Sequence, residues 1–81
     1  MRPEYDHVRD AHQRMVDAAE RLNATLMRTA EALEWSARLA EEHAQREAHR
    51  GVLEAAAKER DIAYRARAAA QHARTRAARP N

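Results

Sequence analysis

Residues 41–54 read EEHAQREAHRGVLE, and they contain Gly51, the only glycine of the 81-residue chain. Gly51 follows His49 and Arg50. Basic residues ahead of a glycine are typical of the end of a helix, where glycine takes the left-handed backbone conformation. Residues 41–50 are polar apart from two alanines, as expected of a helix end exposed near a turn. We therefore expect a helix to end here and a turn at Gly51.

The residues on both sides of this turn favour helix. The chain is dominated by Ala, Arg, Glu, Leu, Met and Gln, which are strong helix formers. Pro3 suits a first helical position, and Pro80 follows the last basic turn. The sequence contains no β-branched run of strand length and no period-two alternation. Six acidic residues precede a basic residue by four positions, which supports helix by roughly 2 kcal/mol in total: Asp10–Arg14, Asp17–Arg21, Glu34–Arg38, Glu42–Arg46, Glu54–Lys58 and Asp61–Arg65.

These patterns predict an all-α protein with a single helical domain that spans the whole chain. The predicted architecture is a long antiparallel hairpin with a helix over residues 3–49, a turn at 50–52 and a second helix over 53–79. We expect this hairpin to assemble into a helical bundle or coiled coil. Because no Ser, Thr, Asp or Asn follows Gly51 as a helix cap, a single long helix in a coiled coil is the alternative, and a three-helix bundle is the third.

Two residue types dominate the composition, since 21 Ala and 14 Arg supply 35 of the 81 positions. Without Ala, only 15 larger apolar residues remain, which is a thin core for so short a chain. The chain has no Cys, so disulfides and Cys-based zinc sites are excluded. No apolar run is long enough to span a membrane, and the polar N-terminus does not resemble a signal peptide. We therefore expect a cytoplasmic protein that gains stability from a partner chain and not from a membrane.

The larger apolar residues are concentrated on one face of the first predicted helix. At about 100° per residue they fall within one arc, which predicts a core-facing stripe. In the second helix the same arc is filled almost entirely by Ala, which lets another helix approach closely. A turn at Gly51 would place Ile62 near Ala40 and Ala69 near Leu33, so that small residues meet large ones. The residues expected to form this main interface seam are Val8, Met15, Leu22, Leu26, Leu33 and Ile62.

Four further large residues fall on nearly the opposite side of the helical wheel. A helix pair buries only one face of each helix, so a second apolar face predicts contact with another chain. An alternative within the monomer is that the Trp side chain folds back on its neighbours. Trp and Tyr are among the residue types that dominate protein interfaces. The predicted second interface consists of Trp35, Leu39, Leu53 and Tyr64.

Residues for catalysis or metal binding do not occur in productive patterns. Ser36 is the only Ser, and no His lies within a helical turn of it. One glycine cannot form a phosphate-binding loop. The five His are not spaced four apart as in a helical zinc site, and Glu4 with His7 matches only a fragment of a di-iron ligand set. We therefore expect no enzyme, no cofactor, no metal and no small-molecule substrate.

Charge is distributed unevenly along the chain. Residues 1–61 contain all 13 acidic residues and ten basic ones, a net charge of −3, whereas residues 62–81 contain five Arg and no acidic residue. Such a segment is typical of contact with the phosphate backbone of nucleic acid. Basic residues also stabilise a helix C-terminus without any partner. The possible phosphate contacts are Arg65, Arg67, Arg74, Arg76 and Arg79.

The leading hypothesis from the sequence is a non-enzymatic helical oligomerisation module. It would be a self-associating scaffold or adaptor that forms a homodimeric four-helix bundle and binds another protein. The alternative is a small nucleic-acid-associated protein that contacts the phosphate backbone through its Arg-rich C-terminal helix.

Overall fold

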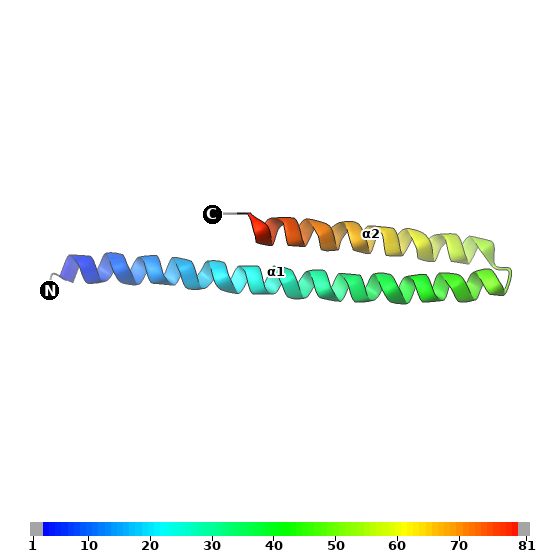
Figure 1. Ribbon diagram of the computed structural model, residues 1–81, viewed down its shortest axis with the longest axis horizontal. Helices are drawn as coiled ribbons and strands as arrows, with labels where there is room; N and C mark the ends of the chain where they lie inside the picture. Colours follow the sequence, from blue (N-terminus) through cyan, green and yellow to red (C-terminus); the bar gives the residue numbers. More distant parts are fainter. Residues whose placement is uncertain (1–2, 80–81) are drawn as a thin grey trace.

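The computed structural model describes residues 3–79 and consists of two helices that pack side by side (Figure 1). Helix α1 runs from Pro3 to His49 and helix α2 from Leu53 to Ala78. The two helices are antiparallel, and the described chain forms a rod of 74 × 15 × 12 Å. The predicted all-α helical hairpin with its turn near Gly51 is confirmed. A single continuous helix is excluded by this turn, and a three-helix bundle is excluded because α1 is unbroken.

The turn is built by backbone hydrogen bonds around Gly51, whose φ of 82° lies in the left-handed region. The N–H of Gly51 donates to the carbonyl of Ala48 at 3.0 Å, and the N–H of Val52 donates to the carbonyl of Glu47 at 2.9 Å. These two bonds form a Schellman motif, which satisfies carbonyls left without partners at the end of α1. The carbonyl of Val52 then accepts from the N–H of Ala56 at 3.1 Å and starts α2. Helix α2 therefore begins without a side-chain cap.

We expect the substitution Gly51→Ala to destabilise the hairpin by about 1 kcal/mol, because an L-residue in the left-handed region is strained. A Cβ atom at this position would have no atom within 4 Å, so the cost is conformational and not steric. Urea unfolding at one fixed protein concentration measures the loss. Gly51→Asn is the control, since Asn tolerates this conformation better and should lose less. A Gly51→Ala chain as stable as the parent would contradict the role of this turn.

The seam between the two helices is made of alanine. Every fully buried side chain among those described belongs to Ala, and these residues are Ala30, Ala37, Ala40, Ala44, Ala56, Ala63, Ala70 and Ala73. Leu26 and Leu33 pack against the cluster of Ala30, Ala70 and Ala73, and Ala66 packs against the cluster of Ala37, Ala40 and Ala63. In α1 the seam residues follow one another at alternating steps of four and three, which keeps one stripe turned toward a neighbouring helix.

The structure differs from the predicted pairing across the seam. Ala63, and not Ile62, packs with Ala40, while Ile62 is half exposed. Ala69 is exposed, and its neighbour Ala70 lies in the seam cluster. The predicted pairing assumes that the chain keeps turning by the same angle per residue through residues 50–52, but those residues are not helical. The turn therefore changes the rotation of α2 about its axis.

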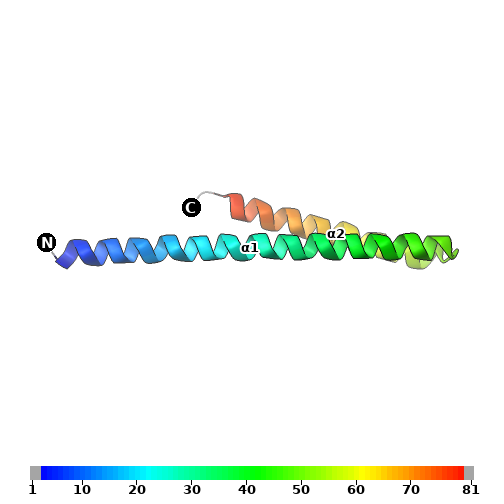
Figure 2. The same ribbon diagram turned by 60° about the horizontal axis from the view of Figure 1, so that its bottom comes forward.

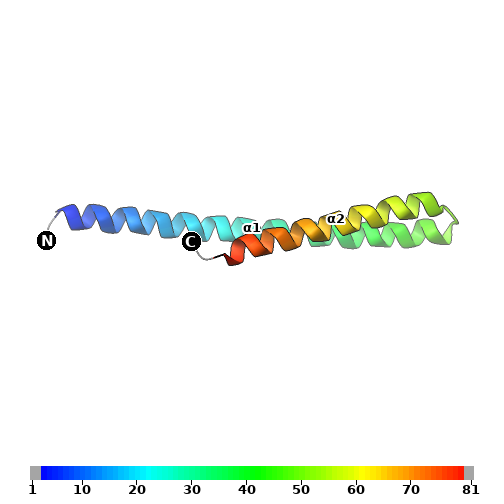
Figure 3. The same cartoon turned by 90° about the horizontal axis from the view of Figure 1, so that it is seen from above.

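Helix α1 is much longer than α2, so the two helices overlap only in part. Ala73 of α2 lies in the same cluster as Leu26 and Ala30, and α2 ends five residues later at Ala78. The first part of α1, residues 3–22, therefore extends past the end of α2 by roughly 30 Å at 1.5 Å per residue. Figures 1, 2 and 3 show this from three directions. We call residues 3–22 the arm.

Candidate protein interaction surfaces

The large apolar side chains of this protein lie mostly outside its core. Three examples on the arm are Val8, Met15 and Leu22, which are 69%, 71% and 53% exposed. Soluble monomers rarely leave large apolar side chains exposed in continuous groups, and such groups mark interaction surfaces. The exposed large hydrophobic residues are Tyr5, Val8, Met15, Leu22, Met27, Trp35, Leu39, Val52, Leu53, Ile62 and Tyr64.

The six residues of the predicted main seam divide into two groups. Leu26 and Leu33 pack against the alanine cluster between the helices. Val8, Met15 and Leu22 lie on the arm, where α2 does not reach, and the remaining one, Ile62, is exposed on α2. The hairpin alone therefore does not bury these four side chains.

The apolar stripe of the arm is continuous with the seam. Met15 and Leu22 lie within about 40° of Leu26 and Leu33 around the helix axis. Val16 and Ala19 flank this stripe and are half-buried by their own helix neighbours. A shallow hollow runs along this part of the arm and is lined by His12, Met15, Val16, Ala19, Glu20 and Asn23. The face that packs against α2 thus continues beyond the point where α2 ends.

The four residues of the predicted second interface lie on two different helices. Trp35 and Leu39 are one turn apart on α1, and Trp35 lies about half a turn from Leu33 and Ala37, which face α2. Trp35 is therefore separated from Tyr64 of α2 by the body of α1. Trp35 is 58% exposed, and the guanidinium of Arg38 lies over its ring, 5.3 Å from the centroid.

Leu53 and Tyr64 are also exposed, on α2. They are 11 residues apart, which is about 16 Å along a helix. The structure thus places the four residues on separate surfaces and not in one patch.

One edge of the seam carries ion pairs between the helices. Glu41 of α1 accepts a hydrogen bond from Arg67 of α2, and Glu34 accepts one from Arg74. Glu41 lies seven residues after Glu34, and Arg74 lies seven residues after Arg67. Both pairs therefore lie on the same side of the hairpin. The hydrogen bond from Arg67 is the main cause that lowers the pKa of Glu41; desolvation by burial opposes it, and the charge of Arg67 adds a smaller lowering. A hollow beside these pairs is lined by Glu34, Arg38, Arg67 and Gln71.

Removing the guanidinium in Arg67→Gln is expected to return the pKa of Glu41 toward its ordinary value of 4.5. A carboxyl whose pKa is lowered by folding stabilises the folded state above its unfolded pKa, and this contribution is lost as the pH falls through the folded pKa. The parent hairpin should therefore lose a small part of its stability below about pH 4.5, and the variant should not. Carboxyl NMR titration of Glu41 measures the pKa. Arg65→Gln is the control, because Arg65 pairs with Asp61 of the same helix; an unchanged pKa in Arg67→Gln would contradict the pairing.

The opposite edge of the seam carries no charge over its central part. Helical geometry places Thr29 and Ser36 of α1 on the side of the stripe away from Glu34. It places Ile62 and Ala69 of α2 on the side away from Arg67. All four are exposed. We call Thr29, Ser36, Ile62 and Ala69 the uncharged edge.

The five arginines of the basic C-terminal segment are not equally available. Arg67 and Arg74 pair with α1, and the Nε of Arg65 lies 3.1 Å from Oδ2 of Asp61. Arg76 and Arg79 are exposed near the end of α2. Three of the five predicted phosphate contacts thus form ion pairs within the hairpin. The pair of Arg65 with Asp61 was predicted from the i,i+4 spacing, whereas the pairs of Arg67 and Arg74 with α1 were not.

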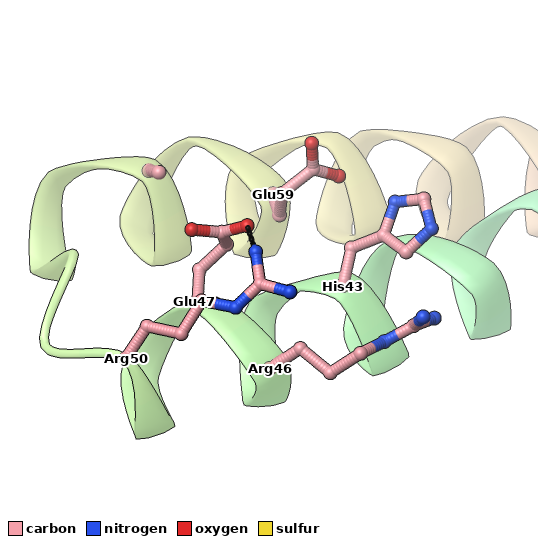
Figure 4. A pocket seen from close by; sticks show the side chains of 6 residues that line it. His43, Arg46, Glu47, Arg50 and Glu59 are labelled. Carbon is pink, nitrogen blue, oxygen red and sulfur yellow. Dashed lines mark hydrogen bonds and ion pairs between the residues drawn. The ribbon is translucent and has the colours of Figure 1, made fainter.

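A second charged hollow lies beside the turn (Figure 4). It is lined by His43, Arg46 and Glu47 of α1, by Arg50 of the turn, and by Ala55 and Glu59 of α2. The side chains of Arg50 and Glu47 are joined by an ion pair of 3.4 Å. The site is open, and its positive and negative groups are mixed. It therefore offers no array of one charge type to a ligand.

Within residues 3–79 no three His, Asp or Glu side chains converge in a way that could hold a metal ion. Neither described helix contains an apolar stretch long enough to cross a membrane. The chain matches no known protein family, no curated protein and no solved structure. The surfaces described above are therefore the basis on which a function is proposed.

Proposed function

We propose that this protein is a self-associating helical module that scaffolds or binds other proteins and has no enzymatic activity. The observation that carries the proposal is that the larger apolar side chains lie on the surface, whereas the buried ones belong to alanine. The seam of the hairpin buries only alanine completely, while eleven large hydrophobic side chains are exposed. A buried Ala removes much less apolar surface from water than a Leu or Met does, so most of the hydrophobic stabilisation available to this chain lies outside the hairpin.

The alanine seam suits a role as a building block. Small residues let two helices approach closely, and the resulting thin rod presents its larger side chains outward. The uncharged edge, with Ile62 at its centre and Leu22 and Leu39 on the same side of α1, supports the packing of a second hairpin against it. Hairpins packed in this way form a four-helix bundle. Trp35 and Tyr64, on other surfaces, are then available to a different protein.

The proposal does not extend to nucleic acid. Arg67 and Arg74 already neutralise carboxylates of α1, and Arg65 pairs with Asp61. In the basic C-terminal segment this leaves Arg76 and Arg79 without an ion-pair partner in the described hairpin, and phosphate-backbone binding depends on many such contacts.

The dependence of thermal stability on protein concentration tests this function. A chain whose folded state is an oligomer unfolds at a higher temperature when its concentration is raised, because only folded chains associate and association lowers the free energy of the folded state. We expect the midpoint followed by circular dichroism to rise over a hundredfold increase in concentration. A midpoint that is the same at all concentrations would contradict self-association.

A further inference from the structure

The arm is a continuation of an interface that the structure already contains. Its stripe of Val8, Met15 and Leu22 leads directly into Leu26 and Leu33, which pack against α2. Helix α2 ends at Ala78, close to the level of Leu22. The surface that would be covered by a longer α2 is therefore exposed over about 20 residues of helix.

We propose that this surface is covered by the arm of a second copy of the chain, with the two arms antiparallel and related by a twofold axis at Met15. The inference rests on the proposed function, since it assigns a surface and a register to the first step of self-association. The paired arms place the two hairpins at opposite ends of a longer rod, so the four-helix bundle through the uncharged edge forms when such dimers pack side by side. In this register the residue numbers of facing positions add up to about 30. Val8 then faces Leu22 of the partner, Leu22 faces Val8 of the partner, and the two Met15 side chains meet on the axis.

Two opposite charges at the margin of the arm favour a second copy in this orientation. Arg9 and Glu20 are both exposed and lie within about 20° of each other, on the same side of the stripe and roughly 120–140° around the axis from Met15. Their numbers add up to 29, so each Arg9 lies opposite Glu20 of the partner, and the pair occurs twice. In a parallel pairing this flank of one arm would face the other flank of its partner, so Arg9 and Glu20 would not meet.

The other flank of the stripe allows close approach. Ala11 and Ala18 lie there, both exposed, and their numbers also add up to 29. Each Ala11 therefore faces Ala18 of the partner, and small residues at facing positions let the helices come near each other. In the antiparallel register, the apolar, charged and small residues of one arm thus each meet complementary residues of the partner's arm.

Single-cysteine variants test the register, because the chain contains no native Cys. We expect Met15→Cys to form a covalent dimer in high yield on oxidation or with a short bis-maleimide, as seen by denaturing electrophoresis. Val8→Cys and Leu22→Cys are each expected to stay unlinked alone, since two copies of the same position lie about 21 Å apart. A mixture of these two variants should link. Gln13→Cys, on the outer side of the same arm, is the matched control and should not link.

The outcomes separate this inference from the proposed function. An oligomer in which Met15→Cys links no better than Gln13→Cys overturns the register and leaves self-association standing. Self-linking of Val8→Cys indicates a parallel pairing and also overturns it. Linking of none of the variants together with the mass of a single chain overturns both proposals. Circular dichroism of each variant verifies that the hairpin is folded, as expected for exposed positions.

Discussion

A chain with Met15→Glu is expected to lose self-association, and mixing it with a Met15→Lys chain is expected to restore it. Met15 is 71% exposed in the hairpin, so neither substitution should disturb the fold of one chain. At the proposed twofold axis, however, two like charges would meet, which costs several kcal/mol. The dimer should therefore dissociate at concentrations roughly 100-fold or more above those at which the parent dissociates. In the mixture the two opposite charges meet and a heterodimer forms.

Sedimentation equilibrium of each variant and of their mixture measures the effect. Gln13→Glu and Gln13→Lys introduce the same charges two residues away, on the outer side of the arm, and should assemble like the parent. An unchanged mass of the Met15→Glu chain would contradict the placement of Met15 in an interface. A mixture that remains monomeric while both variants are helical would contradict its position at the axis.

The second large effect is expected within the hairpin, where Ala70→Leu should force the helices apart. Ala70 is 1% exposed and lies against Ala30, which is 0% exposed. The seam has no space for three more carbon atoms, and overpacking of this kind costs about 1–3 kcal/mol. For a chain that buries so little, a loss of this size is a large fraction of its stability.

Urea unfolding at one protein concentration measures this loss. Ala68→Leu is the matched control, since Ala68 is exposed on the same helix and Leu is nearly as good a helix former as Ala. We expect Ala68→Leu to leave the midpoint almost unchanged. If Ala70→Leu is as stable as Ala68→Leu, the alanines do not pack helix against helix as described.

The hairpin itself could be predicted from local chemistry. Gly51 is the one residue of the chain that adopts the left-handed conformation without strain, and the motif around it closes α1 through backbone bonds alone. The missing cap residue at the start of α2 left a continuous helix open as an alternative, because a side-chain cap is the usual sequence signal for a new helix. The structure starts α2 from the carbonyl of Val52, which no sequence signal marks.

The facing residues of α2 could not be predicted in the same way. Helical periodicity fixes angles only within one continuous helix, and the turn rotates α2 by an amount that depends on its backbone geometry. Ala63 and Ala70 therefore occupy the positions that helical periodicity predicted for Ile62 and Ala69. With 21 Ala in the chain, composition does not distinguish one alanine stripe from another.

The ion pairs between the helices have a signal in the sequence, which is the matched spacing of their charged residues. Glu34 and Glu41 are seven residues apart in α1, and Arg67 and Arg74 are seven apart in α2. In antiparallel helices such matched spacings bring two pairs together on one edge. Counting acid–base pairs only at i,i+4 considers a single helix and misses these contacts. Comparing the seven-residue spacings of the two helices would also have predicted the rotation of α2 about its axis.

The mass of the parent chain in solution tests the central claim most directly. Sedimentation equilibrium over a dilution series from high to low micromolar concentration gives this mass, and circular dichroism of the same samples reports the helix content. Self-association through the exposed apolar surfaces predicts at least twice the chain mass of 9.3 kDa at the upper concentrations, with dissociation on dilution. A helical, folded species of 9.3 kDa at every concentration would contradict it.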